Sequence, residues 1–126
     1  MPFYQFIVPA GSATARKRAE VAAAVTTVHA QITGAPREYV NCSFTEVPPG
    51  SIFAGGSVVE SSRMVGIIRQ GRSEEVKRKP MMALADAWAS VTGEPVEDIA
   101  LFVHEVPGYQ VMERGLLLPE ASEDQQ

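Results

Sequence analysis

The sequence predicts an α/β protein of two fused β-α-β units, whose four strands form one sheet with two helices on one face. The chain repeats itself: identical residues recur 59 positions apart, at Thr33/Thr92, Gly34/Gly93, Pro36/Pro95, Glu38/Glu97, Glu46/Glu105, Val47/Val106 and Pro48/Pro107. Each half also has the pattern strand, helix, strand, with a connection long enough to make its two strands parallel. We therefore expect one domain over residues 1–119, with repeats at about 2–48 and 61–107.

The first repeat opens with the strand Pro2–Val8, which is apolar on both faces and therefore predicts a strand covered on both sides. Ser12 or Thr14 can cap the helix that follows. Apolar residues then recur at helical spacing, at Val21, Val25, Val28 and Ile32. The segment Thr33–Pro36 ends this helix with a glycine cap and a proline. Val40–Val47 is the second predicted strand.

The second repeat follows a predicted loop, Ser51–Ser62, and begins with a strand at Met64–Arg69. A helix starts at Ser73 and ends at Thr92–Pro95, although Pro80 inside it should cost a hydrogen bond and produce a kink. The fourth strand is Ile99–Glu105, and Pro107-Gly108 turns the chain into Val111–Leu118. The polar, acidic tail at 120–126 is predicted to be disordered.

Composition excludes several classes of partner. The formal charge of −4 and the pI near 5.1 argue against nucleic acid or an anionic membrane surface. The first apolar run is too short for export or membrane spanning, and the single Cys42 fits a reducing compartment, so we expect a cytoplasmic protein. Two histidines and one cysteine argue against a structural metal site.

Two helices cannot cover both faces of a four-stranded sheet. The face that they leave open is predicted to carry apolar side chains, which we expect to include Tyr4, Phe6 and Val8. Such a face needs a partner, so the sequence predicts an oligomer.

Five residues carry groups able to do chemistry. Removal of Met1 would leave Pro2 with a free secondary amine, although proline is also an ordinary first residue of a strand. Arg69 and Arg72 flank the start of the second helix, where they either bind a carboxylate or phosphate or are solvated loop residues.

His29 lies at the edge of the apolar stripe of the first helix, where it either faces a cleft or is a satisfied boundary histidine. Glu113 lies among Val111, Met112 and Leu116, and is either a site residue or a surface glutamate on a turn.

These motifs, taken in order, resemble the tautomerase superfamily, and within it the cis-3-chloroacrylic acid dehalogenase group. The resemblance rests on Pro2 opening a strand, on His29, on Arg69-Gln-Gly-Arg72, on Phe53-Ala-Gly-Gly56 and on Val111-Met-Glu113-Arg-Gly115. It implies a β-α-β tautomerase fold, a homotrimer, and a site that needs neither cofactor nor metal. It further implies that Pro2 is the acid/base, that Arg69 and Arg72 bind the substrate carboxylate with help from His29, and that Glu113 orients or activates water.

One departure from the family pattern bears on the reaction. Where the dehalogenases have a tyrosine before the final Glu-x-Pro, this chain has Phe102; His104 lies on the same strand face as Phe102 and is a candidate substitute. Both are predicted to line the pocket.

We therefore expect a tautomerase of small 2-oxo or enol carboxylates such as phenylenolpyruvate, with weak cis-3-haloacrylate dehalogenase or hydratase activity. Two alternatives stay open at this point. One is a non-catalytic ligand-binding or assembly domain on a ferredoxin-like sheet, and the other is a hydratase or decarboxylase of acetylenic acids. The hydratase or decarboxylase would use the same residues as the tautomerase and is separable from it only by substrate screening, whereas a retained Met1 would favour the non-catalytic domain.

Overall fold

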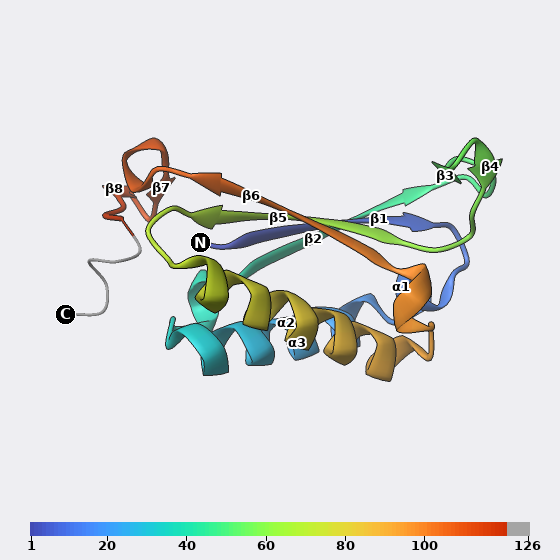
Figure 1. Cartoon of the computed structure of the whole chain (residues 1–126), viewed down its shortest axis with the longest axis horizontal. Coiled ribbons are helices and arrows are strands. Elements are labelled where there is room, and N and C mark those ends of the chain that lie inside the picture. Colours follow the sequence, from blue (N-terminus) through green and yellow to red (C-terminus); the bar gives the residue numbers. More distant parts are fainter. Residues whose placement is uncertain (121–126) are drawn as a thin grey trace.

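A computed structural model describes residues 1–120, in which four strands form one sheet. The strands are β1 (Phe3–Pro9), β2 (Asn41–Val47), β5 (Arg63–Arg69) and β6 (Ala100–Val106), in the spatial order β2-β1-β5-β6 (Figure 1). β1 pairs with β2 in parallel and β5 pairs with β6 in parallel, whereas the central strands β1 and β5 are antiparallel. The predicted fold class, two fused β-α-β units in one sheet, is confirmed.

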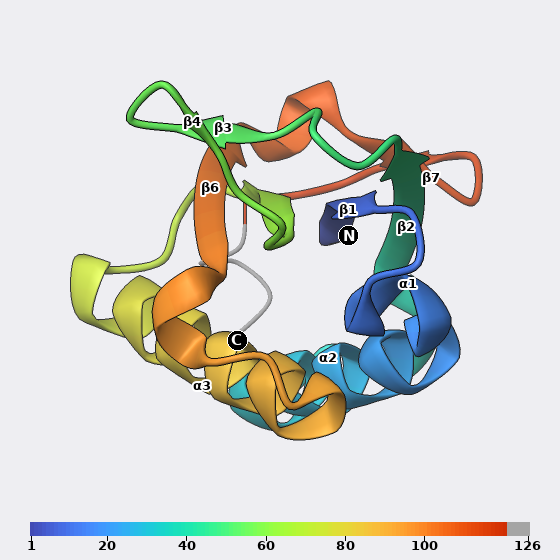
Figure 2. The same ribbon diagram turned by 90° about the vertical axis from the view of Figure 1, so that its right-hand side faces the viewer.

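The helices α2 (Arg18–Thr33) and α3 (Glu74–Thr92) lie together across one face of the sheet (Figures 1 and 2). Each ends at a glycine in the left-handed conformation, Gly34 at φ 75° and Gly93 at φ 77°, as a glycine C-cap does. The repeated Gly-x-Pro pattern therefore marks the same helix end twice. Within residues 1–120, no helix is long and apolar enough to cross a membrane.

The start of the first helix differs from the prediction in one respect. A short helix, α1 (Ala13–Arg16), precedes α2, and Ser12 caps it by accepting a hydrogen bond from the Ala15 N–H at 3.2 Å. Thr14 is instead fully buried, where it accepts from Trp88 Nε1 at 2.8 Å and donates to Glu94 Oε1 at 2.6 Å. This network ties the beginning of the first repeat to α3.

The core lies between the sheet and the helices, and β1 supplies its centre. The Phe6 ring stacks on that of Phe44 at 4.5 Å and meets the edge of Trp88 at 5.2 Å. Tyr4, Phe6 and Val8 all face the helices, so the prediction that they lie on the open face is wrong. Because β1 is apolar on both faces, its pattern did not say which face the helices cover.

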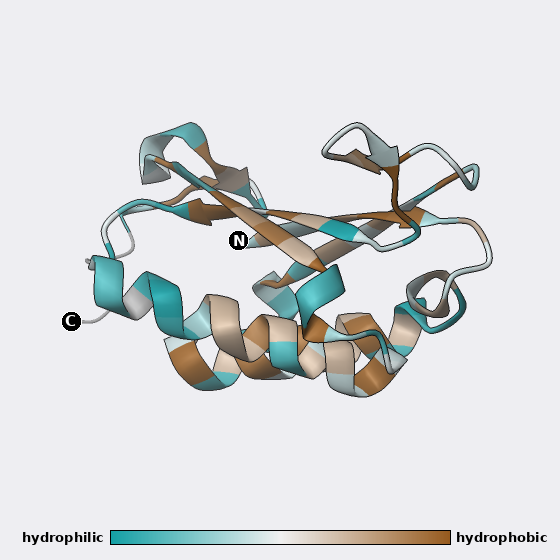
Figure 3. Ribbon diagram, turned by 45° about the vertical axis from the view of Figure 1, so that its right-hand side comes forward, coloured by the Kyte–Doolittle hydropathy of each residue, from teal (hydrophilic) through white to brown (hydrophobic). Residues whose placement is uncertain are grey.

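The opposite face of the sheet is open. Strand alternation places Phe3, which is 38% exposed, and Phe102, which is 58% exposed, on this face. Hydrophobic residues continue along the strands as well as on the helices (Figure 3). The prediction of an apolar face without a helix to cover it holds, with these residues in place of Tyr4, Phe6 and Val8.

Two short hairpins extend the repeat to the ends of the sheet. β3 (Phe53–Ala54) and β4 (Ser57–Val58) lie inside the predicted loop at one end, and β7 (Met112–Glu113) and β8 (Leu116–Leu117) lie at the other (Figure 1). The remaining connections contain the 3-10 turns η1 (Arg37–Tyr39), η2 (Val96–Asp98) and η3 (Gly108–Gln110). The predicted disordered tail, 120–126, lies outside the described residues except for Glu120.

Pro80 lies inside α3, which nevertheless runs without interruption to Thr92. Its ring lines a cavity of about 30 Å³ between α3 and the sheet, together with Tyr4, His29 and Leu84. The proline therefore faces the buried side of the helix, next to a histidine of the candidate site.

Candidate active site

The antiparallel pairing of β1 with β5 brings the candidate residues to one end of the sheet. Phe3 pairs with Ile67, so the residues before β1 lie beside the end of β5, where Arg69 is. The carboxyl end of α2, the start of α3 and the β7–β8 hairpin meet at this same end (Figure 1). Residues distant in the sequence thus surround one space.

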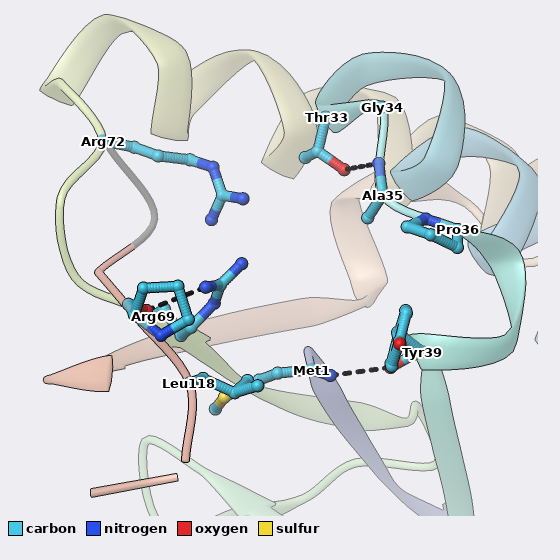
Figure 4. A pocket seen from close by; sticks show the side chains of 10 residues that line it. Met1, Thr33, Gly34, Ala35, Pro36, Tyr39, Arg69, Arg72 and Leu118 are labelled. Carbon is cyan, nitrogen blue, oxygen red and sulfur yellow. Dashed lines mark hydrogen bonds between the residues drawn. The ribbon is translucent and has the colours of Figure 1, made fainter. Parts of the chain in front are cut away.

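That space is a cavity of about 380 Å³, lined by Met1, Thr33, Tyr39, Arg69, Arg72 and Leu118 among others. Figure 4 shows the guanidinium groups of Arg69 and Arg72 pointing into the same space, with Met1 across from them. Two of the predicted site residues, Arg69 and Arg72, therefore share a pocket with the amino terminus.

Both arginines are held in a partly desolvated setting. Arg69 is 9% exposed and donates from Nη1 to the Pro119 carbonyl at 2.8 Å. Burial lowers the pKa of both guanidinium groups, and for Arg69 the charge of Arg72 adds to the effect. The Nε of Arg72 is buried and has no hydrogen-bond acceptor within residues 1–120. A buried donor of this kind is stabilised by an acceptor such as a carboxylate oxygen.

The terminal amine of Met1 lies at the edge of the cavity and donates to the Tyr39 carbonyl at 2.9 Å. It also forms an ion pair with Glu113. Burial lowers the pKa of this amine, and the Glu113 carboxylate opposes that shift. Pro2 follows directly and is fully buried at the start of β1.

Glu113 is positioned by the turn of its hairpin. Arg114 at φ 54° and Gly115 at φ 79° form this turn in left-handed conformations, as a two-residue hairpin turn requires. The Arg114 guanidinium lies 4.6 Å from the centre of the Tyr39 ring, which fastens the hairpin to the turn before β2. The predicted water-activating carboxylate is thus brought to the amine of Met1, the residue before the predicted base Pro2.

His29 is more deeply buried than its predicted place at the edge of the helix stripe, with 3% of its surface exposed. Its Nδ1 lies 2.7 Å from the Tyr4 hydroxyl. Burial lowers the pKa of His29 to about 4, and the positive charges of Arg72 and the terminal amine contribute. His29 does not line the 380 Å³ cavity; it lines the 30 Å³ cavity, which shares Thr33 and Arg72 with the larger one. With this pKa the histidine is uncharged at neutral pH, and it lines the smaller cavity together with Arg72.

Phe102 and His104 lie on the open face of the sheet, and neither lines the arginine cavity of the same chain. Sequence reasoning also missed three residues that contact the site: Tyr4, Tyr39 and Asn41. Tyr4 was assigned to packing alone, and a strand pattern carries no signal for the hydrogen bond that its hydroxyl makes to His29.

A second cavity, of about 400 Å³, lies at the opposite end of the sheet and is related to the first by the repeat. The registers pair Phe3 with Asn41 and Arg63 with Ala100, so Ser62 takes the place that Pro2 has in the first repeat. Ser61, Glu60, Glu94 and Asp98 line this cavity, and no arginine does. It lacks the cationic character of the first.

Comparison with solved structures defines the class of protein. The structure of N1, a member of the cis-3-chloroacrylic acid dehalogenase family, has a TM-score of 0.91 and 31% identity, and the match covers 98% of this chain and 87% of that chain. A native fused 4-OT has a TM-score of 0.80 and 27% identity, and the match covers 98% of this chain and 99% of that chain. The fold is therefore the β-α-β fold of the tautomerases.

The chain belongs to the tautomerase family described as "Putative oxalocrotonate tautomerase enzyme", which it matches over residues 1–126. The resemblance to the tautomerase superfamily is thereby confirmed. No curated protein sequence matches the chain.

The burial of His29 makes stability depend on pH. Because its folded pKa of about 4 lies below the ordinary value of 6.5, the unfolded chain takes up the proton first as the pH falls. The share of the unfolding free energy that comes from the uncharged His29 is complete above pH 6.5 and is lost as the pH approaches 4. We expect the unfolding free energy to fall by about 2 kcal/mol more between pH 7 and pH 5 in the wild type than in His29→Gln. Urea unfolding at the two pH values measures this, and equal losses of unfolding free energy in the two proteins would contradict it.

Proposed function

We propose that this protein is a cofactor-free tautomerase of small 2-oxo or enol carboxylates, in which the amine of Pro2 is the acid/base. The observation that carries the proposal is that the amino terminus, Arg69 and Arg72 line one cavity. Removal of Met1 would give Pro2 a free secondary amine next to Glu113. The charge, burial and grouping of these residues fit an anionic substrate better than a neutral one.

In the proposed reaction, Arg69 and Arg72 bind the substrate carboxylate, and the buried Nε of Arg72 receives its acceptor. The neutral amine of Pro2 takes the proton of the enol hydroxyl. The enol electrons then take up a proton at carbon 3 from the resulting ammonium, which yields the 2-oxo acid and restores the amine. Proximity and the positive charge of the arginines lower the barrier, and the step needs no metal or cofactor.

His29 contributes through Arg72 in this proposal. Because its pKa is lowered to about 4, the histidine is uncharged at neutral pH and does not repel the neighbouring guanidinium of Arg72. Tautomerisation consumes no water, so Glu113 activates none in that reaction. In hydration or dehalogenation, Glu113 would orient or activate the attacking water. The proposed weak activity on cis-3-haloacrylates depends on that second role.

The first test concerns the base and the carboxylate site. In a protein whose intact mass shows Pro2 as the first residue, we expect steady-state assays with phenylenolpyruvate to detect turnover. Arg72→Ala should cost the transition state about 2–4 kcal/mol, or roughly 30- to 1000-fold in kcat/KM. Pro2→Ala keeps a primary amine in nearly the same place, so activity should fall without vanishing. Arg78→Ala, which changes an exposed arginine on α3, is the matched control. Retention of Met1 would favour a non-catalytic binding domain, whereas wild-type turnover by both site variants would show that the site is wrongly assigned.

We further propose that the chain forms a homotrimer through the open face of the sheet. The exposed Phe3 and Phe102 support the proposal, because such a face is stabilised by burial against other copies. A fused 4-OT of the same fold was solved as a symmetric trimer, with a TM-score of 0.81, 19% identity and matched coverage of 98% and 99%. Multi-angle light scattering at micromolar concentration should give three times the mass of one chain. A monodisperse monomer would contradict the trimer.

Phe102 tests the proposed preference for tautomerisation over water addition. A phenyl ring cannot hydrogen-bond an attacking water, whereas tautomerisation needs none. In the proposed trimer the open face is an interface, so Phe102 and His104 would reach the pocket of a neighbouring chain. We expect Phe102→Tyr to raise turnover of cis-3-chloroacrylate about tenfold or more while leaving phenylenolpyruvate turnover nearly unchanged. Equal changes in both rates, or efficient dehalogenation by the wild type, would refute this role, and His104→Phe would then be the next variant.

A further inference from the structure

The side chain of Asn41, the first residue of β2, connects the two groups on which the proposed chemistry depends. Its Nδ2 lies 3.2 Å from the Pro2 carbonyl oxygen and 3.3 Å from Glu113 Oε2. A third acceptor, the Tyr39 carbonyl oxygen, lies at 3.1 Å. The backbone N–H of Asn41 also donates to the Pro2 carbonyl at 3.0 Å, so the residue is fixed relative to Pro2.

The surroundings determine which way this amide points. Three oxygen atoms surround Nδ2, and none of them belongs to a donor that the amide oxygen could accept from. Rotating the amide by half a turn would place Oδ1 against the same oxygens, including a carboxylate. The nitrogen therefore faces Glu113. Its two hydrogens point at three acceptor oxygens, so one hydrogen is shared between two of these oxygens.

This contact differs from the other contact that Glu113 makes at the site. The ion pair of Glu113 joins it to the amine of Met1, and that pair disappears when Met1 is removed. The hydrogen bond from Asn41 does not involve Met1. It runs from β2 to the β7–β8 hairpin, and the same nitrogen contacts the Pro2 carbonyl.

We propose that Asn41 is a positioning residue that holds the Glu113 carboxylate beside the amine of Pro2. The inference rests on the proposed function, since it takes Pro2 to be the terminal residue. The charged groups that face the Met1 amine, which lies one residue before the Pro2 nitrogen, are Glu113, whose negative charge stabilises the ammonium form, and Arg69 and Arg114, whose positive charges oppose it. Without Asn41, Glu113 can turn toward solvent, which leaves the amine facing Arg69 and Arg114.

The test measures the titration of the Pro2 amine by NMR, with ¹⁵N-labelled proline in protein that begins at Pro2. Asn41→Leu removes the hydrogen bonds at similar volume, and Glu113→Gln removes the charge. We expect each change to lower the pKa of the amine, and the double variant to have the same pKa as Glu113→Gln alone. If Asn41→Leu leaves the amine pKa unchanged, or lowers it further in the Glu113→Gln protein, the proposal is overturned.

Two further variants make the test independent of folding. Asn41→Ser cannot reach Glu113 but stays polar, so it should lower the pKa as Asn41→Leu does, even if the leucine variant fails to fold. Asn41→Gln keeps a donor of slightly longer reach and should restore most of the wild-type pKa. A serine variant with the wild-type pKa would refute the positioning role.

Activity supplies an independent readout. Since Glu113 is proposed to act on water, Asn41→Leu should reduce hydration of an acetylenic acid or a haloacrylate by about 10- to 100-fold. Turnover of phenylenolpyruvate, measured above the amine pKa, should change much less. Equal losses on both substrates would indicate general damage to the fold and contradict the proposal. Because the NMR titration needs no turnover, absence of any tautomerase activity would refute the proposed function and leave the test of Asn41 intact.

Discussion

The antiparallel contact between β1 and β5 is the constraint from which the candidate site follows. Each repeat alone is a parallel pair, and in a parallel pair the two strands begin at the same end. Only the pairing across the repeats places the start of one strand beside the end of another. The residues before β1 therefore meet Arg69, at the end of β5, and Arg72, which follows it, because the two repeats share one sheet. Neither repeat could form this cavity by itself.

Charge balance then limits what the cavity can hold. It gathers an amine and two guanidinium groups in a partly buried space, with Glu113 as their neighbouring carboxylate. Desolvation makes an unpaired cation costly, so a positively charged pocket of this kind favours an anion that neutralises it. The pKa of His29 is lowered to about 4, so at neutral pH the amine and the two guanidinium groups supply the positive charge of the pocket. The proposed affinity for carboxylates would thus be a property of the whole arrangement, beyond the two arginines.

The sequence was sufficient for the layout of the fold, since the repeat fixed two β-α-β units and the glycine caps fixed both helix ends. The sequence was insufficient where one pattern of apolar residues is compatible with two ways of packing. β1 is apolar on both faces, so only packing decided that Tyr4 and Phe6 face the helices. The depth of His29 depends on Tyr4, and the role of Asn41 depends on a hairpin distant in the sequence; both are contacts between segments, which helical or strand periodicity does not encode.

The position of Ser62 has a consequence for the evolution of a fused chain. It takes the place of Pro2 in the second repeat, but its nitrogen follows Ser61 through a peptide bond and is an amide, whatever residue stands there. A duplicated unit that depends on a terminal amine therefore cannot duplicate its base along with its fold. Under the proposed function, the cavity at that end, lined by Glu60, Glu94 and Asp98 among others, therefore cannot hold a base of the kind proposed for Pro2. Under the proposed function, a fused chain of this kind therefore has one terminal amine for two repeats.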